Sequence, residues 1–330
     1  MSRQRERHVL VIITGGTICM QDSPNGLVPT RDFVGNCLQP SPEFNDGSLD
    51  DTTTLKNEYG GSGTARTLRA PPRTDNISSH LYSVFEFAEL IDSSSMNGGH
   101  WNLILACLKH NWINFDAFVV LHGTDTLAYT ASMLAFMLGK LDKTVIVTGS
   151  QLSMYAPNND AHDNLLDSLT VAAGYNVPEV GVVFHHHLYR ATRVTKVSAF
   201  SMAAFTTPNA KALASFDKHR GKQWATQLHL DTITSADSRK HVTTNGHSLL
   251  PEQAQLDLDT SRVAILKVYP GINSSLISSI VQIPNLGGLI LETFGAGNIP
   301  IASKGNGLLQ VLSNAVKNGI VVVSVTQCTQ

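Results

Sequence analysis

Charged side chains are scarce in this sequence, and neither sign dominates. They make up 15% of its 330 residues, with 24 basic against 26 acidic residues and no block of like charge. Such a balance argues against nucleic acid or an anionic membrane as the main partner. The charged N-terminus, Met1 to His8, is followed only by an apolar run of strand length. We therefore expect neither a signal peptide nor a membrane span there.

Cysteine is rare as well. The four cysteines, at positions 19, 37, 107 and 328, are scattered and match no zinc spacing, so we expect reduced thiols in a cytoplasmic protein. The sequence also lacks G-x-G-x-x-G and G-K-[ST]. This absence counts against a nucleotide-binding protein that would use Gly15-Gly16-Thr17 for phosphate.

One continuous apolar stretch near the middle of the chain stands out. Ala117 to Leu121 has the pattern of a parallel strand that is covered by helices on both faces. It ends at His122-Gly123, and the polar residues Thr124 to Thr126 lead into apolar helix formers from Leu127 to Leu138. This order would place hydroxyls and a carboxylate at the edge where open parallel sheets bind their ligands.

The same order of strand and polar turn occurs twice more. Val9 to Ile13 ends in Thr14 to Thr17, and Thr144 to Val147 ends in Thr148 to Gln151. Gly, Thr and Ser are common turn residues, and this explanation would suffice for a single turn. Three such turns on one sheet would gather hydroxyls along one edge, so together they favour a functional site.

The chain is too long for one compact core, so we expect an α/β protein of two domains. We predict an N-terminal domain over residues 1–209, a linker over 210–260 and a smaller C-terminal domain over 261–330. The linker is polar and irregular. Residues 44–79 are rich in Asp, Thr, Gly and Ser with little apolar content, which predicts a disordered surface insertion in the first domain.

The triplet His185 to His187 raises the possibility of a metal, but its local pattern argues against one. On an extended chain adjacent side chains point to opposite faces, so two of the three at most would converge. No carboxylate or cysteine has a helpful spacing, and we expect no metal. Lys196, taken alone, would be an ordinary solvated charge.

Several short motifs follow one another in a fixed order. The first two are Thr14-Gly15-Gly16-Thr17-Ile18 and His122-Gly123-Thr124-Asp125-Thr126. The others are Thr148 to Gln151, Asp160 with Asn164, Tyr189-Arg190 with Thr195-Lys196, Thr207-Pro208-Asn209, Tyr269-Pro270-Gly271, Gly295 to Asn298, and Thr326-Gln327-Cys328. In this order they resemble the bacterial-type L-asparaginases, in particular the cytoplasmic type I branch that includes animal asparaginase-like proteins.

The resemblance implies a parallel-sheet N-terminal domain and a smaller, flavodoxin-like C-terminal domain. It implies hydrolysis of L-asparagine to L-aspartate and ammonia in two steps through a threonine acyl-enzyme. Such chemistry needs no metal or organic cofactor. The family also implies a homodimer or homotetramer when the C-terminal domain is complete. The alternative is a degenerate, non-catalytic relative that serves as a binding or regulatory protein.

By resemblance, Thr17 is the attacking nucleophile. Thr124 would hold or activate the water of the second step, with Lys196 and Asp125 as its hydrogen-bonded partners and Lys196 as a proton shuttle. Backbone N–H groups of the glycine-threonine turn would bind the oxyanion.

The same resemblance suggests the groups that bind the substrate. Asp125 would hold the α-ammonium group beside Thr124. Ser93 matches the position that binds the α-carboxylate, with help from the neighbouring Ser94. Asn298 matches a residue that the family contributes to the site of a neighbouring subunit.

The sequence departs from the family pattern in three places. Leu27 replaces a tyrosine of the mobile loop that follows the first motif, and Ser95 replaces an aspartate. Family chains also continue beyond the motif at Thr326 to Cys328, near which this sequence stops. We therefore expect an incomplete C-terminal domain that exposes apolar surface, and low activity.

Overall fold

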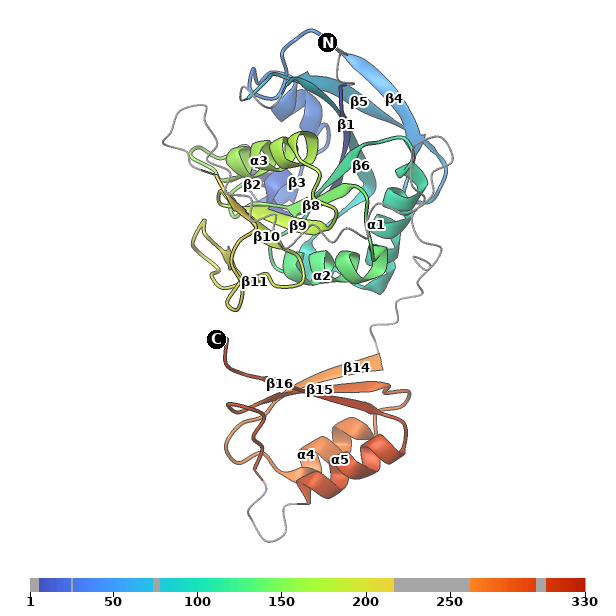
Figure 1. Ribbon diagram of the computed structural model, residues 1–330, viewed down its shortest axis with the longest axis vertical. Helices are drawn as coiled ribbons and strands as arrows, with labels where there is room; N and C mark the ends of the chain where they lie inside the picture. Colours follow the sequence, from blue (N-terminus) through green and yellow to red (C-terminus); the bar gives the residue numbers. More distant parts are fainter. Residues whose placement is uncertain (1–5, 25, 74–77, 217–261, 301–306, 330) are drawn as a thin grey trace. The chain divides into compact units, whose positions relative to one another are not determined.

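The computed structural model describes residues 6–24, 26–73, 78–216, 262–300 and 307–329. The chain forms two compact units, Met1–Leu256 and Asp257–Gln330, which are drawn in Figure 1. The predicted linker 210–260 lies outside the described residues except at its beginning. There the prediction is wrong, because Ala214–Ser215 forms strand β13 and pairs with the sheet of the first unit.

A nine-stranded mixed sheet organises the first unit. Its order is β13 (Ala214–Ser215), β10 (His187–Arg190), β9 (Val180–Phe184), β8 (Thr144–Thr148), β7 (Ala117–Leu121), β1 (His8–Gly15), β6 (His80–Ile91), β5 (Ser62–Ala70) and β4 (Asp51–Lys56). The five central strands, β9 to β6 in this order, are parallel, and the outer ones are antiparallel. The α/β fold class is confirmed.

Helices cover both faces of this sheet, which explains why its central strands are apolar throughout. Helix α3 (Ala161–Gly174) packs on one face, while α1 (Gly98–Asn111) and α2 (Leu127–Leu138) lie on the other (Figure 1). Strands β7 and β8 are buried over their whole length. No helix in the described ranges is long and apolar enough to cross a membrane.

Short elements complete the first unit. Hairpins form between β2 (Met20–Ser23) and β3 (Gly26–Pro29) and between β11 (Thr195–Lys196) and β12 (Phe205–Thr206). Single helical turns span Thr17–Cys19, Val34–Leu38 and Ser93–Ser95.

The prediction of a disordered insertion over residues 44–79 is wrong for the residues that the structure describes. Strands β4 and β5 lie in this range and extend the sheet beyond β6. Thr53 and Thr67 join their hydroxyls across β4 and β5 at 2.6 Å, and Thr67 reaches Ser83 of β6 at 2.7 Å. Hydroxyls that bond across strands let a segment with few apolar residues hold its place in a sheet.

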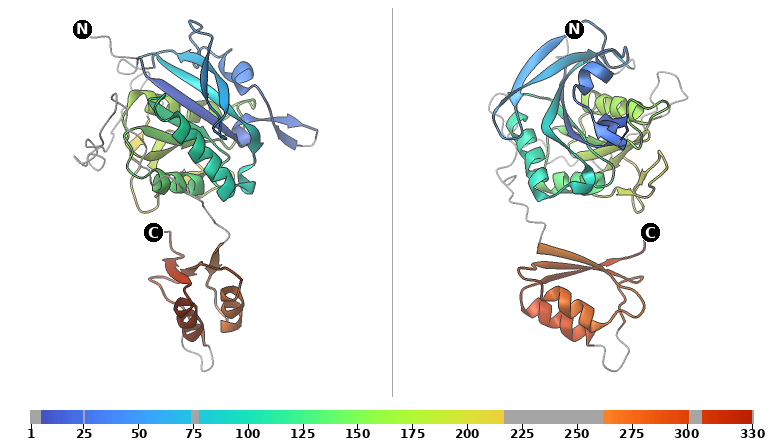
Figure 2. Two further views of the ribbon diagram at one scale, coloured as in Figure 1. Left: turned by 90° about the vertical axis from the view of Figure 1, so that its right-hand side faces the viewer. Right: turned by 180° about the vertical axis from the view of Figure 1, so that it is seen from behind.

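The second unit is a two-layer fragment, a three-stranded parallel sheet with helices on one face. Its elements follow in the order β14 (Val263–Lys267), α4 (Ser274–Val281), β15 (Gly288–Thr293), α5 (Leu308–Lys317) and β16 (Val321–Thr326). Because parallel crossovers are right-handed, two successive crossovers in one direction put both helices on the same face (Figure 2).

The other face of this sheet carries exposed apolar side chains. They are Val263, Ile265, Val321, Val323 and Val325, each more than 40% exposed. Leu289 and Leu291 point the opposite way and are buried with α4 and α5 in one core. The expected exposure of apolar surface in this unit is therefore confirmed.

Candidate active site

The turns that follow β1, β7 and β8 are neighbours, because these three strands are adjacent and parallel. Their glycines bring the backbones into direct contact. A Cβ on Gly16 would lie 2.4 Å from Gly123 Cα, and one on Gly149 would lie 2.1 Å from the His122 carbonyl oxygen. Only glycine fits at such an approach. The predicted meeting of the three turns is thus present in the structure.

Replacing Gly16 should disrupt this contact, and Gly26 provides a matched control. Both glycines have positive φ, 91° and 95°, but an added Cβ on Gly26 meets nothing within 4 Å. We expect Gly26→Ala to lower the free energy of unfolding by about 1 kcal/mol, the backbone strain alone. Gly16→Ala adds the clash with Gly123, so we expect a loss of about 3 kcal/mol or more. Equal losses in urea denaturation would show that the contact is unimportant.

Ser93 fits into the back of the second turn. It follows β6, is 2% exposed, and its Oγ would lie 2.4 Å from a Cβ on Gly123. The Thr126 hydroxyl donates to the Ser93 carbonyl oxygen at 2.7 Å. Ser94 is exposed, and its backbone N–H donates to the Asp92 carboxylate at 3.1 Å. Both predicted serines therefore lie at this edge of the sheet.

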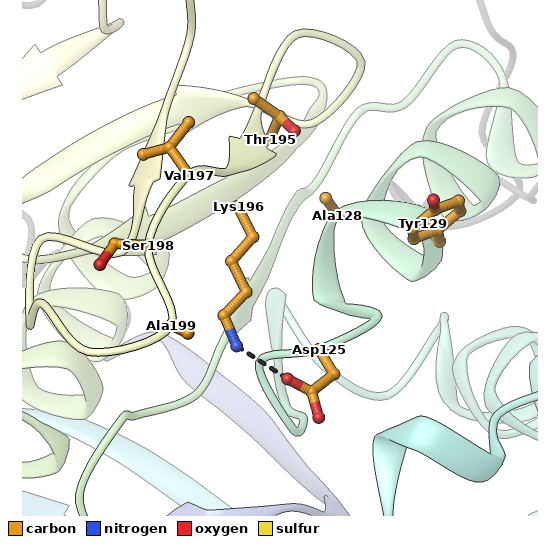
Figure 3. A pocket seen from close by; sticks show the side chains of 8 residues that line it. All are labelled: Asp125, Ala128, Tyr129, Thr195, Lys196, Val197, Ser198 and Ala199. Carbon is orange, nitrogen blue, oxygen red and sulfur yellow. Dashed lines mark hydrogen bonds and ion pairs between the residues drawn. The ribbon is translucent and has the colours of Figure 1, made fainter. Parts of the chain in front are cut away.

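Lys196 reaches the second turn from the hairpin of β11 and β12. Its Nζ donates to Thr124 Oγ1 and to Asp125 Oδ1, both at 2.8 Å, as Figure 3 shows for the carboxylate. The Lys196 side chain is 21% exposed and that of Asp125 is 62% exposed. Beside this pair opens a pocket of about 490 Å³. Lys196 is thus a paired group within the site, and the solvated surface charge suggested by its local sequence is excluded.

Gln151 sets the direction of the hydrogen bonds around Thr124, a contribution that the sequence analysis missed. Its Nε2 donates to the carbonyl oxygens of Ala199 and Ser201 at 3.0 and 3.2 Å, so its Oε1 is left to accept. The Thr124 hydroxyl donates to that oxygen at 3.2 Å and accepts from Lys196. The position of Gln151 in the third strand-and-turn motif was the available signal.

Asp160 and Asn164 hold the third turn. Asp160 stands at the N-terminus of α3, but its carboxylate does not cap that helix. It accepts instead from the backbone N–H groups of Gln151 and Leu152, both at 2.9 Å. Asn164 donates to the Gly149 carbonyl oxygen at 2.9 Å. Asp160 and Asn164 therefore fix the backbone of the turn that carries Gln151.

Thr17 begins a short helical turn directly after Gly16 and is half-buried. Its hydroxyl has no hydrogen-bond partner within the described part of the chain. The nearby Cys19 donates its Sγ–H to the Gly16 carbonyl oxygen at 3.2 Å. Burial raises the pKa of the Cys19 thiol to about 12, so it stays protonated and is a poor competing nucleophile.

Asn298 lies in the second unit, in the turn after β15. There its backbone exchanges hydrogen bonds with Phe294, at 2.8 and 3.0 Å. It therefore does not belong to the cluster of residues that the first unit brings together.

The histidine triplet forms a turn, and the prediction of an extended chain there is wrong. His185 and His186 have positive φ, 44° and 60°, between β9 and β10. Carboxylates that local spacing did not reveal reach His186 from α3, Asp167 at 2.9 Å and Asp163 at 3.5 Å. Among the described residues, no group of three His, Cys, Asp or Glu could hold a metal ion.

Comparison with known proteins identifies matches along both units. Residues 8–228 match the N-terminal asparaginase domain, and residues 262–330 match the glutaminase/asparaginase C-terminal domain. L-asparaginase 1 of Escherichia coli K12 is 32% identical over 98% of this chain and 80% of its own. The structure of L-asparaginase I from Vibrio cholerae covers 98% of this chain, with 82% of its own chain matched, at a TM-score of 0.71 and 30% identity.

A longer human protein also matches. It is named 60 kDa lysophospholipase and is 36% identical over 98% of this chain, which spans 51% of its length. A mouse protein of the same name is matched over 52% of its length. The chain therefore spans about half the length of these two relatives.

Proposed function

This chain belongs to the asparaginase family, and from that premise we propose that it hydrolyses L-asparagine to L-aspartate and ammonia. The observation that carries the proposal is the ammonium of Lys196, which binds both Thr124 and Asp125 at 2.8 Å beside the turn of Thr17. A solvent-facing pocket next to charged and hydroxyl groups suits a small, doubly charged amino acid.

In the first step, we assign Thr17 as the nucleophile. Its Oγ attacks the side-chain amide carbon, and the N–H groups of the glycine-threonine turn stabilise the oxyanion. The intermediate then collapses, the C–N bond breaks, and the proton from the Thr17 hydroxyl leaves with ammonia. An ester between Thr17 and the aspartyl group remains. A hydroxyl without a competing partner in the described residues supports this role.

In the second step, water attacks the ester carbon and regenerates the Thr17 hydroxyl. We assign Thr124 as the group that holds this water. Lys196 fixes the Thr124 hydroxyl and relays the proton that the attacking water loses to the Thr17 oxygen, which leaves as the hydroxyl. Gln151 and Lys196 already orient that hydroxyl, so little reorganisation is needed.

Substrate recognition follows from the charges at the pocket. Lys196 engages Oδ1 of Asp125, which leaves Oδ2 for the α-ammonium group of the substrate. The Ser93–Ser95 turn offers its hydroxyls for the α-carboxylate, with Ser94 exposed toward solvent. Asn298 would contribute from a neighbouring subunit of a homodimer or homotetramer. All four cysteines are unpaired, which suits the cytoplasmic location that we propose.

Ammonia release is the direct test. The purified protein should release ammonia from L-asparagine in a coupled assay, and L-glutamine measured in parallel gives the amide preference. Lysophosphatidylcholine should be included because of the name of the human relative. Calorimetric binding of L-asparagine without any ammonia would instead establish the non-catalytic alternative.

A further inference from the structure

Behind the Thr124 turn lies a line of buried polar groups that the proposed mechanism does not use. His122, at the end of β7, and Thr130, in α2, are both fully buried. Trp101 Nε1 of α1 lies 2.9 Å from Thr130 Oγ1, which lies 2.9 Å from His122 Nε2. His122 Nδ1 lies 2.7 Å from the carbonyl oxygen of Gly123, the residue before Thr124.

The chemistry of the two ends gives this line a single direction. An indole N–H can only donate and a carbonyl oxygen can only accept, so Thr130 receives from Trp101 and His122 Nδ1 donates to Gly123. Burial lowers the pKa of His122 to about 4, so the ring is neutral at pH 7 and Nε2 carries a lone pair. The Thr130 hydroxyl therefore donates to Nε2, and every group in the line is satisfied.

The last bond of the line acts on the peptide that joins Gly123 to Thr124. Gly16 and Ser93 press on Gly123 from neighbouring segments and prevent it from shifting. The remaining freedom is rotation of the peptide plane. No cis peptide occurs in the described chain, so this peptide is trans and its C=O and N–H point in opposite directions. With the oxygen held by His122, the Thr124 N–H points away from that buried ring.

On the basis of the proposed function of this site, we infer that His122, held by Thr130 and Trp101, is a positioning residue that locks the Gly123–Thr124 peptide and thereby orients Thr124. A buried histidine that merely satisfies its own hydrogen bonds would have no preferred target. His122 instead donates to the peptide that precedes Thr124, and the Thr124 side chain is held by both Lys196 and Gln151. His122 is fully buried and is not among the residues that line the pocket, so it acts through Thr124.

The test is Thr130→Val, which keeps the side-chain shape and removes the hydroxyl. We expect kcat to fall at least about tenfold, with KM changed less than about threefold, because orientation of a catalytic group is lost. Thr130→Ser restores a hydroxyl and should recover most of the rate. Thr170→Val makes the same change at a buried position of α3, where the hydroxyl donates to the Leu166 carbonyl oxygen at 2.7 Å and accepts from Arg73 at 3.4 Å. It should lower stability without lowering kcat.

A second readout separates this inference from the proposed function. In Thr130→Val, nitrogen NMR of the histidine rings should show a shifted His122 Nε2 resonance as the hydrogen bond to Nε2 is lost, and the Thr124 amide should exchange faster with solvent. Both measurements need no substrate, so they decide the inference even if the wild type releases no ammonia. An unchanged exchange rate of the Thr124 amide, or a wild-type kcat in Thr130→Val, would overturn it. An equal loss of kcat in Thr170→Val would do the same.

Discussion

Thr17→Ala is expected to lower kcat for ammonia release at least about a thousandfold, the scale for removing a covalent nucleophile. The Thr17 side chain is half-buried, and its hydroxyl has no partner among the described residues, so its loss leaves no buried group unsatisfied. The free energy of unfolding should therefore change by less than about 1 kcal/mol. Steady-state kinetics and urea denaturation of the same preparation measure the two effects.

Two controls make the Thr17 prediction specific. Thr17→Ser keeps a hydroxyl at the same position and should retain measurable turnover. An alkylating analogue of asparagine should add one mass increment to the intact wild type and none to Thr17→Ala. Near-normal turnover in Thr17→Ala, or an adduct that persists on Cys19, would show that another group attacks the amide.

Lys196→Met is expected to lower kcat by about 10²–10⁴-fold, the range for losing a group that moves a proton. Methionine preserves the aliphatic stem. Asp125, which loses its ion pair, is 62% exposed and remains solvated, so the protein should stay folded. Lys211→Met removes a lysine from an exposed position and should leave kcat unchanged. A Lys196→Met protein that is inactive only because it has unfolded would make Lys196 a structural residue.

Thr124→Val extends the same prediction, because Lys196 and Thr124 are proposed to act as one unit. Each single variant should lose most of the rate. The double variant should be hardly worse than the poorer single one, since groups that work together are not additive. Multiplicative losses in this cycle would mean that the hydrogen bond of 2.8 Å between them has no catalytic consequence.

Local patterns in the sequence were sufficient for the central sheet. A parallel strand covered on both faces needs a continuous apolar run, and the residues Ala117 to Leu121 have this pattern. Thr14 to Thr17 and Thr148 to Gln151 follow runs of the same kind, so their meeting at one edge could be predicted. The order of motifs then indicated the family.

Only the tertiary structure shows which side chains, far apart in the sequence, become hydrogen-bond or ion-pair partners. Residues 44–79 looked too polar to fold, but in the described part of this range the backbone of β5 and the hydroxyl of Thr67 find partners on β6. His122 could not be read as a positioning residue, because Trp101 and Thr130 reach it only after α1 and α2 pack together. His186 likewise meets its carboxylates across the gap between a hairpin and α3. Periodicity reports which face of an element is buried, whereas a hydrogen-bond partner from another element is set by packing, which no local pattern records.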